Sequence, residues 1–359
     1  MPETSWRLFR FALPLRISLP SGARVRQGWL IQIQQAEAVG WGEVAPLPGF
    51  SRETLDEAGR ILQDRLFRLT SFPPEITWAE WAEAVEQSLE SVPASVRWGV
   101  ELALAQCQAA RRGKRLDTWL APDPLPMVSI NALIPIDWRE HPERLQAIRA
   151  AGYQAVKVKV GQHAPKEAAQ DVRLLRNLLG PEVELRVDAN RAWSLREALT
   201  FAEAIADRNV AYLEEPLRDP AELHDFVRRS PVPVALDETL AEQPDVPLHC
   251  WEGVAAVVLK PALIGGLLRA WQRAREANAL GMTVVWSAAF ETGVGTRGLL
   301  ALAAASHSKA AAGLDPYHWL ADDVVYPRLA LHPATRVADA LTGPWRLNAA
   351  VLEEVNEHA

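Results

Sequence analysis

The pattern of apolar and polar residues changes character twice along the chain. Over residues 6–46 the two kinds of side chain alternate, which predicts an antiparallel meander with turns at Gly22 and Gly40. From Ser51 onward apolar residues recur at helical spacing, and helices are expected near 55–66, 78–89 and 96–110. Two prolines and an aspartate within residues 121–124 then mark a boundary.

Beyond this boundary, short apolar runs alternate with Ala- and Leu-rich helical segments up to about residue 320. The runs expected to form strands are 127–134, 155–160, 183–189, 210–214, 232–237, 255–260, 283–287 and 310–315. Eight strands with intervening helices match a TIM-type (β/α)7β barrel. We therefore predict an α/β fold with an N-terminal α+β capping domain over 1–122, a barrel over 123–320 and a C-terminal segment over 321–359 that returns to the cap.

Composition restricts the class of protein. The 359 residues are 49% hydrophobic and 23% charged, which is ordinary for a globular chain, and the net charge of −7 disfavours nucleic acid and anionic membranes as partners. The only cysteines, Cys107 and Cys250, are far apart and predict two reduced thiols. We expect a cytoplasmic protein, because no secretory signal begins the chain and no apolar run approaches the roughly 20 residues of a membrane span.

Charged residues end five successive predicted strands, at Lys159, Asp188, Glu214, Asp237 and Lys260. Parallel strands of a barrel bring these ends to one mouth. Because side chains alternate along a strand, a second lysine two residues before the first one shares its face and is expected to point with it into the barrel. Lysines that protect an exposed sheet edge are the alternative, but five successive strands cannot all be edges.

The three acids predict a divalent-metal site. Asp188, Glu214 and Asp237 are hard oxygen donors without a His or Cys partner, which suits Mg²⁺ or Mn²⁺ better than Zn²⁺. Taken alone, Glu214 could instead be a carboxylate at a helix start. The adjacent acids, Glu215 and Glu238, have the opposite parity and are expected to be supporting or salt-bridged groups.

A metal between a carboxylate substrate and two lysines suggests removal of a proton α to that carboxylate. A free lysine has a pKa of about 10.4, so a lysine base working near neutrality needs its ammonium form destabilised. Lys157, two residues from Lys159 on the same face, would do this by repulsion.

These residues together resemble the enolase superfamily, in its muconate-lactonizing subgroup, over nearly the whole chain. The motifs that carry the resemblance are 157–159 (KVK), 188–190 (DAN), 214–216 (EEP), 237–239 (DET) and 258–261 (VLKP). The resemblance implies that the first acid of each pair binds Mg²⁺. It also implies that Lys159 and Lys260 face each other across the substrate, with Lys157 as an auxiliary charge.

Finer features resemble the o-succinylbenzoate synthase family of dehydratases. They are the cap segment 42–51 followed by 53–55, Arg186 before the first metal ligand, and the segment 287–293, although Ala288 and Ala289 stand where some relatives would have serines. This resemblance implies a small carboxylate substrate and a Mg²⁺-dependent syn dehydration in menaquinone or phylloquinone biosynthesis, in which Lys159 is the base and Lys260 the stabilising cation. The substrate-binding residues it suggests are Lys157, Arg186, Asn190, Phe50, Ser287 and Glu291.

Three alternatives remain open from the sequence. The same machinery serves N-acylamino-acid racemases and dipeptide epimerases, although an epimerase would be expected to have an acidic pair at the last strand, where only Asp315 occurs. A barrel kept as a scaffold without turnover is disfavoured, because every expected ligand and both lysines are present. Leu47 and Phe50 could simply pack the cap on the barrel. The oligomeric state is not determined by the sequence.

Overall fold

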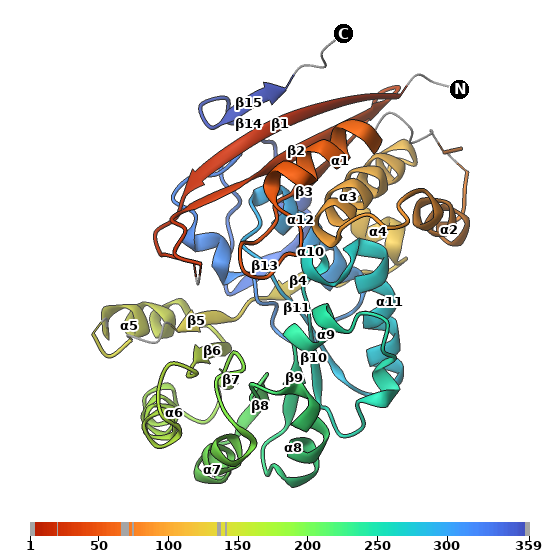
Figure 1. The fold of residues 1–359 in the computed structure, drawn as a ribbon. Coiled ribbons are helices and arrows are strands. Elements are labelled where there is room, and N and C mark those ends of the chain that lie inside the picture. The colour runs from red at the N-terminus through yellow and green to blue at the C-terminus, as the bar shows by residue number, and fades with distance from the viewer. Residues whose placement is uncertain are drawn as a thin grey trace.

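A computed structural model describes residues 4–355, apart from 20, 66–71, 74, 135–137 and 141 (Figure 1). The strands are β1 (Thr4–Pro14), β2 (Val25–Gln35), β3 (Ala38–Val44), β4 (Met127–Ser129), β5 (Ala132–Ile134), β6 (Ala155–Lys159), β7 (Glu184–Asp188), β8 (Val210–Glu214), β9 (Val234–Leu236), β10 (Ala256–Leu259), β11 (Thr283–Trp286), β12 (Val325–Tyr326), β13 (Ala334–Arg336), β14 (Arg346–Leu347) and β15 (Leu352–Val355). The α-helices are α1 (Leu55–Arg65), α2 (Trp78–Ser88), α3 (Ala94–Arg111), α4 (Leu116–Leu120), α5 (Pro142–Ala151), α6 (Pro165–Leu179), α7 (Leu195–Ile205), α8 (Leu223–Arg229), α9 (Glu238–Glu242), α10 (Pro261–Ile264), α11 (Gly266–Ala279), α12 (Gly293–Ala305) and α13 (Val337–Thr342).

The cap is built on a four-stranded antiparallel sheet in the order β15-β1-β2-β3. Its three N-terminal strands are the predicted meander. The C-terminal strand β15 pairs with β1, with Leu8 opposite Val355 and Phe11 opposite Leu352, so the two ends of the chain lie side by side (Figure 1). The predicted return of the C-terminal segment to the cap is therefore confirmed.

One of the two predicted turns in the meander is wrong. Gly22 does lie in the turn after β1 and adopts a φ of +83°, but β2 and β3 are joined at residues 36–37, and Gly40 lies within β3. A Cβ atom at Gly40 would overlap the carbonyl oxygen of Ala103 in α3. The glycine is needed for the close approach of a helix to the sheet, and its φ is not left-handed.

Helix α3 joins the cap to the barrel. It packs against β3 on one side and against α10 and α11 on another, and nearly all of its residues are buried. A helix that is covered on every side requires apolar or small residues around its whole circumference. Its two buried charges, Arg97 and Glu101, form an ion pair at 3.0 Å.

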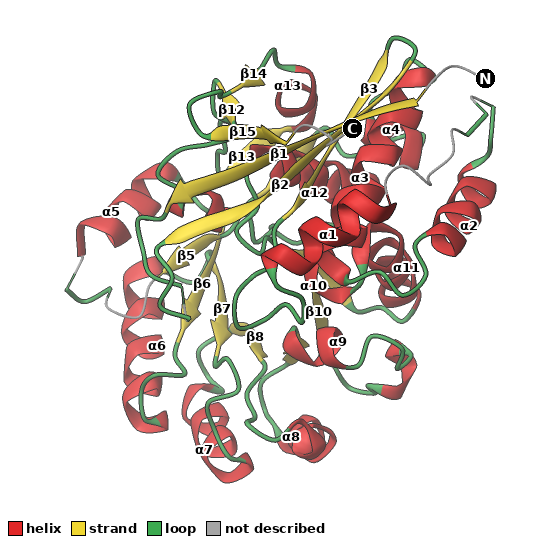
Figure 2. Cartoon of the chain, turned by 45° about the horizontal axis from the view of Figure 1, so that its top comes forward, coloured by secondary structure: helices red, strands yellow, loops and turns green. Residues whose placement is uncertain are grey.

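The second large sheet is parallel and curled, with seven strands in the order β11-β10-β9-β8-β7-β6-β5, and helices such as α6 and α7 lie along its outside (Figure 2). Residues near 312 complete the ring: Ala312 bridges Ile130, and Gly313 bridges Ser287, both in parallel fashion. This arrangement confirms the barrel. The eighth predicted strand is reduced to single bridges, and the first one divides into β4, which pairs with β13, and β5, which pairs with β6.

Side chains alternate across the barrel wall as predicted. Val156 and Val158 of β6 belong to the main apolar core, which the outer helices cover. The opposite parity of β8–β11 forms a separate small apolar cluster inside the barrel, made of Tyr212, Ala235, Ala256, Val258 and Val285. Lys157 and Lys159 have this interior parity, so charged strand ends and apolar residues share the interior of the barrel.

Two further expectations can be compared with the structure. Cys107 is buried, Cys250 is exposed, and both are free thiols. Among the described residues, no helix combines the length and the apolar character that crossing a membrane requires.

Candidate active site

Strand register brings the charged strand ends together. Lys159 at the end of β6 pairs with Asp188 at the end of β7, and Asp188 in turn pairs with Glu214 at the end of β8. Glu214 lies beside Ala235 of β9, two residues before Asp237. The neighbouring strands of a parallel sheet therefore deliver their last side chains to one mouth of the barrel.

The lysines at this mouth differ in how they are held. The Nζ atom of Lys157 lies 2.6 Å from Glu214 Oε1 and 2.9 Å from Asp188 Oδ2, and the Nζ atom of Lys260 is bound to Asp237 Oδ2. Lys159 instead donates to Asn190 Oδ1 at 2.8 Å and stays 3.9 Å from Asp188. Its side chain is 41% exposed, against 14% for Lys157 and 16% for Lys260. Lys159 is thus the most accessible of the three.

Burial and crowding perturb the carboxyl groups of this cluster. Burial, with Asp188 and Asp237 nearby, raises the pKa of Glu214 well above its usual range, although Lys157 opposes this shift. Burial alone would also raise the pKa of Asp188, but Lys157 and Lys159 lower it to about 2. Two carboxylates that share a buried site cannot both ionise freely without a compensating cation.

Glu238 belongs to this cluster, although its parity predicted a supporting role. The strand β9 ends at Leu236, and Asp237 has φ −133° and ψ −83°, so the alternation of side chains stops there. Glu238 accepts from Asn190 Nδ2 at 3.2 Å, and burial beside Asp237 raises its pKa to about 7. Had the strand been predicted to end at Leu236 and not at Asp237, the position of Glu238 in the cluster would have been expected.

Glu215 is a salt-bridged supporting group, as predicted. Its carboxylate accepts from the backbone N–H groups of Asp237 and Thr239, both at 2.8 Å, and from Arg191 Nε at 2.9 Å. Asn190, Arg191 and Glu215 all have left-handed φ values, of +43°, +58° and +39°. Such conformations cost roughly 1–3 kcal/mol each in non-glycine residues and persist where surrounding contacts enforce them.

The acids of the cluster have the chemistry of a magnesium site. Asp188 Oδ2, Glu214 Oε2 and Glu238 Oε2 are buried oxygens without a hydrogen-bond partner in the described part of the chain, although Asp188 Oδ2 lies in the ion pair with Lys157. In the side-chain arrangement of the described residues, no three His, Cys, Asp or Glu groups converge as a ready-made metal site. Lys157 and Lys260 instead bind carboxylate oxygens of this cluster. Unpartnered hard oxygens of this kind suit a divalent cation, which would compete with Lys157 and Lys260.

The other predicted substrate residues lie outside this cluster. Arg186 is buried in the barrel and binds Glu184 Oε1 at 2.5 Å and the carbonyl oxygen of Ala311 at 2.7 Å. Ser287 Oγ is 3.4 Å from the carbonyl oxygen of Gly313, and Phe50 is 36% exposed at a turn of the cap. Asn190, in contrast, joins the cluster through Lys159 and Glu238.

Glu291 lies in a second polar cluster, between the cap and the barrel. It is buried close to Glu43, which accepts from the N–H of Thr292 at 2.9 Å and from the N–H of Gly295 at 3.0 Å. Arg26 donates to the carbonyl oxygens of Pro46 at 2.6 Å, of Phe290 at 3.1 Å, and of Ala45 and Ala289. Sequence reasoning missed Arg26, although a charged residue at an inward position of an amphipathic strand is the signal that could have identified it.

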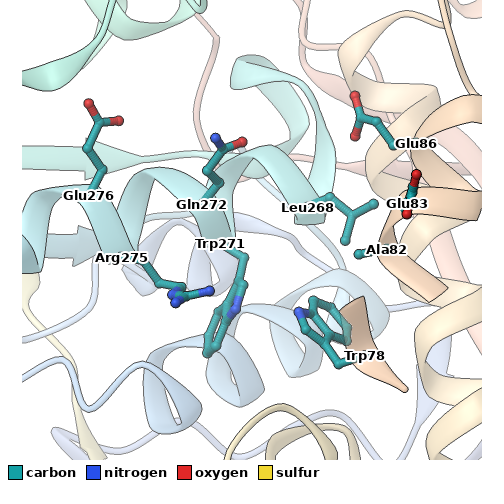
Figure 3. Close-up of a pocket in the computed structure, with 9 residues that line it drawn as sticks. All are labelled: Trp78, Ala82, Glu83, Glu86, Leu268, Trp271, Gln272, Arg275 and Glu276. Atoms are coloured by element: carbon teal, nitrogen blue, oxygen red, sulfur yellow. The ribbon is translucent and has the colours of Figure 1, made fainter. Parts of the chain in front are cut away.

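Cavities elsewhere in the protein are separate from the strand-end cluster. A groove of about 570 Å³ lies between α2 and α11, with the indoles of Trp78 and Trp271 at one end (Figure 3). A smaller cavity of about 210 Å³ lies beside α12. Within the described structure, neither is lined by the charged strand-end residues.

Comparison with known proteins finds related sequences along most of the chain. Residues 140–340 match the family described as enolase C-terminal domain-like, and residues 3–107 match the MenC N-terminal domain. An o-succinylbenzoate synthase from Yersinia pseudotuberculosis is 32% identical over 330 residues, which cover 89% of this chain and 92% of the relative.

Solved structures show the same fold at lower identity. An N-succinyl Arg/Lys racemase from Bacillus cereus is 17% identical with a TM-score of 0.84, covering 99% of this chain and 100% of that one. A dipeptide epimerase from Methylococcus capsulatus, complexed with a Mg ion, is 21% identical with a TM-score of 0.80, covering 94% and 96%. At these identities the likeness concerns the fold alone.

Proposed function

This chain belongs to the enolase superfamily and, within it, to the family of o-succinylbenzoate synthases, and from that premise we propose that it is a Mg²⁺-dependent dehydratase. Its proposed reaction converts 2-succinyl-6-hydroxy-2,4-cyclohexadiene-1-carboxylate to 2-succinylbenzoate and water, as a cytoplasmic step of menaquinone or phylloquinone biosynthesis. The observation that carries the proposal is the unequal state of the lysines: Lys159 is exposed and its carboxylate neighbour Asp188 lies 3.9 Å away, whereas Lys157 and Lys260 are closely ion-paired.

Lys159 is the proposed base. Its neutral amine takes the proton α to the ring carboxylate, and the resulting ammonium returns that proton to the departing hydroxyl on the same face, so that water leaves and the ring becomes aromatic. Asn190 Oδ1, at 2.8 Å, orients Lys159 Nζ without the strong charge of a direct carboxylate partner. Lys260 remains a cation, since Asp237 is among the acids that raise its pKa against the effect of burial, and it stabilises the negative charge that develops on the substrate.

The proposed ligands of Mg²⁺ are Asp188, Glu214 and Asp237, the acids at the ends of β7 and β8 and just after β9. When bound there, the ion would neutralise charge that accumulates on the substrate carboxylate. Glu238 and Asn190 would support this arrangement from the adjoining turns. The unpartnered oxygens of Asp188 and Glu214 support their assignment.

The main alternative is a racemase or epimerase of the same superfamily. Lys159 and Lys260 both lie at the mouth, which is what two-base racemisation would require. The one acid near the last strand, Asp315, is already bound by the N–H of Leu133 at 2.9 Å and by Arg144 at 3.3 Å. An acid engaged in this way is poorly placed to receive a substrate amine, which favours the dehydratase.

A direct assay tests the proposal. Purified protein, Mg²⁺ and the cyclohexadiene substrate should give the ultraviolet change of a newly formed aromatic ring, at a rate that depends on protein concentration. N-succinylamino acids, offered in parallel and followed by polarimetry, test the alternative. Racemisation without any dehydration would overturn the proposed function.

A further inference from the structure

A cavity of about 210 Å³ lies where the cap, the barrel and the C-terminal segment meet. Its wall is formed by β3, the ends of α3 and α4, the first turns of α12, and α13 with the loop after it. The lining residues are Val39, Trp41, Gln106, Lys114, Arg115, Leu116, Val294, Arg297, Ala301, Leu341 and Trp345. At roughly 30 Å³ per water molecule, the cavity has space for about seven waters, or for one small organic molecule.

The charged residues of this wall are all cations. Lys114, Arg115 and Arg297 line it, and none of the lining residues is a carboxylate. Arg115 is neutralised by the buried Asp117, at 2.8 and 3.0 Å, and so contributes little net charge. Lys114 is exposed, and its Nζ has no partner among the described residues. The cavity therefore has a positive character that the protein itself leaves uncompensated.

Arg297 supplies the central donor. It is 9% exposed; its Nε donates to the carbonyl oxygen of Ala340 at 3.0 Å and its Nη1 to that of Gly293 at 2.8 Å. Its Nη2 has no hydrogen-bond partner within the described structure. Asp323 lies nearby but makes no ion pair with it and instead accepts from Tyr317 Oη at 2.6 Å and the Gly293 N–H at 2.9 Å. Arg297 therefore keeps one donor nitrogen available to an acceptor in the cavity.

A neutral donor adds to this set. The amide oxygen of Gln106 accepts from the backbone N–H of Trp41 at 3.2 Å, which leaves its Nε2 free for another acceptor. Gln106 Nε2, Lys114 Nζ and Arg297 Nη2 are thus unused donors on residues of one cavity wall. A donor set of this kind binds an anion in preference to a cation or a neutral molecule.

The rest of the wall is apolar and aromatic. The rings of Trp41 and Trp345 lie 5.6 Å apart in an edge-on arrangement, and the Arg297 guanidinium lies 5.6 Å from the Trp345 ring. Val39 and Leu341 are half-buried beside them. Burying such a surface under a flat apolar group is favourable, and a bare inorganic anion carries no such group.

We propose that this cavity is a binding site for a small aromatic carboxylate, separate from the barrel mouth. Its carboxylate accepts from Arg297, Gln106 and Lys114, and its ring lies against Trp41 and Trp345. The groove in Figure 3 lacks these properties: it is lined by three acids, Glu83, Glu86 and Glu276, and by one cation, Arg275, so its wall does not select an anion. Because the ligand joins the cap to the C-terminal segment, binding stabilises the folded chain.

Calorimetric titration with benzoate tests this site directly, with neutral benzamide and inorganic phosphate as comparison probes. We expect saturable binding of one benzoate and a rise in Tm, with much weaker binding of both other probes. Lys114→Met should weaken benzoate binding by roughly fivefold, as loss of one partly exposed charge-assisted contact predicts. Trp345→Leu should weaken it further, and Lys166→Met, which changes an exposed lysine on α6, is the matched control and should have no effect.

The barrel mouth also carries lysines, so a second variant separates the two locations. Lys159→Met should leave unchanged the benzoate binding that Lys114→Met weakens. If this variant loses binding while Lys114→Met keeps it, the carboxylate binds at the barrel mouth and the proposal is wrong. Equal affinity for phosphate and benzoate, or for benzamide and benzoate, would also overturn it, because the aromatic wall or the donors would then play no part.

Discussion

The two buried polar clusters of this protein are held in opposite ways. At the barrel mouth, carboxylates are paired with lysine side chains. Between cap and barrel, Glu43 and Arg26 are bound largely by backbone groups: Glu43 accepts from two N–H groups, and Arg26 donates to four carbonyl oxygens.

The contrast indicates which cluster can exchange its partners. A charge that is saturated by backbone partners cannot exchange them without unfolding a segment, and it therefore fixes the position of one element on another. A charge whose partners are side chains can release them to a substrate or an ion. Mutations in the cap–barrel cluster should therefore change stability, and mutations at the barrel mouth should change activity.

The largest effect should come from Lys159→Ala. Loss of the proposed base should lower kcat for dehydration by roughly 10⁴-fold, at the upper end of what general acid–base catalysis contributes. Tm should change little, because the side chain is 41% exposed and makes a single hydrogen bond. Lys159→Arg should be equally inactive, because a guanidinium cannot act as a base. Substantial turnover by either variant would contradict the role of Lys159.

Replacing a proposed metal ligand should come next. Asp237→Asn should weaken Mg²⁺ binding and lower activity by roughly 10²- to 10³-fold, as for loss of one charged contact to the reacting centre. Calorimetry of Mg²⁺ binding gives a readout independent of turnover. A chelator should abolish wild-type activity, and Mg²⁺ or Mn²⁺ should restore it. Full activity in excess chelator would show that the acids act only as ion-pair partners of the lysines.

Lys260→Arg should separate dehydration from racemisation. A guanidinium preserves the positive charge, so dehydration should persist at a measurable rate if Lys260 acts only electrostatically. Any racemisation of N-succinylamino acids should disappear, because that reaction requires a second base. A variant as inactive in dehydration as Lys159→Arg would mean that the two lysines share the proton transfer.

The cap–barrel cluster should make the stability of the protein depend on pH. Burial beside Glu291 raises the pKa of Glu43 to about 7, although Thr292 and Arg26 oppose this. The folded state then holds a proton that an unfolded chain releases from about pH 4.5 upward, so the free energy of unfolding should fall as pH rises through this interval up to about 7.

Glu43→Gln should flatten this dependence in denaturant titrations at several pH values. Glu291 and Glu101, whose pKa values are also raised by burial, should preserve part of the slope. Glu75→Gln, at an exposed position, is the control and should leave the wild-type slope unchanged. An unchanged slope in Glu43→Gln would assign the effect to other groups.

The smallest effect should come from Phe50→Ala. If the cap turn excludes water from the barrel mouth, the loss of its apolar ring should lower kcat/KM by several-fold. This change corresponds to a loss of roughly 1–2 kcal/mol of transition-state stabilisation. Stability should be nearly unchanged, because this side chain is 36% exposed. Wild-type kinetics would assign Phe50 to packing alone.

The sequence by itself determined the features that depend on periodicity. Alternation predicted the cap meander and the inward direction of Lys157 and Lys159, and the repeated strand–helix units predicted a barrel with its charged strand ends at one mouth. These features follow from local geometry, because every second side chain along a strand points to the same face.

Only the tertiary structure decided the features that depend on contacts between distant segments. Gly40 serves the approach of α3 and makes no turn, and the eighth strand is reduced to bridges beside Ile130 and Ser287. Glu238 enters the strand-end cluster because Asp237 leaves the extended conformation, and Arg26 is buried because carbonyl groups from two distant loops converge on it. No periodic pattern encodes such placements, because each depends on where another part of the chain packs.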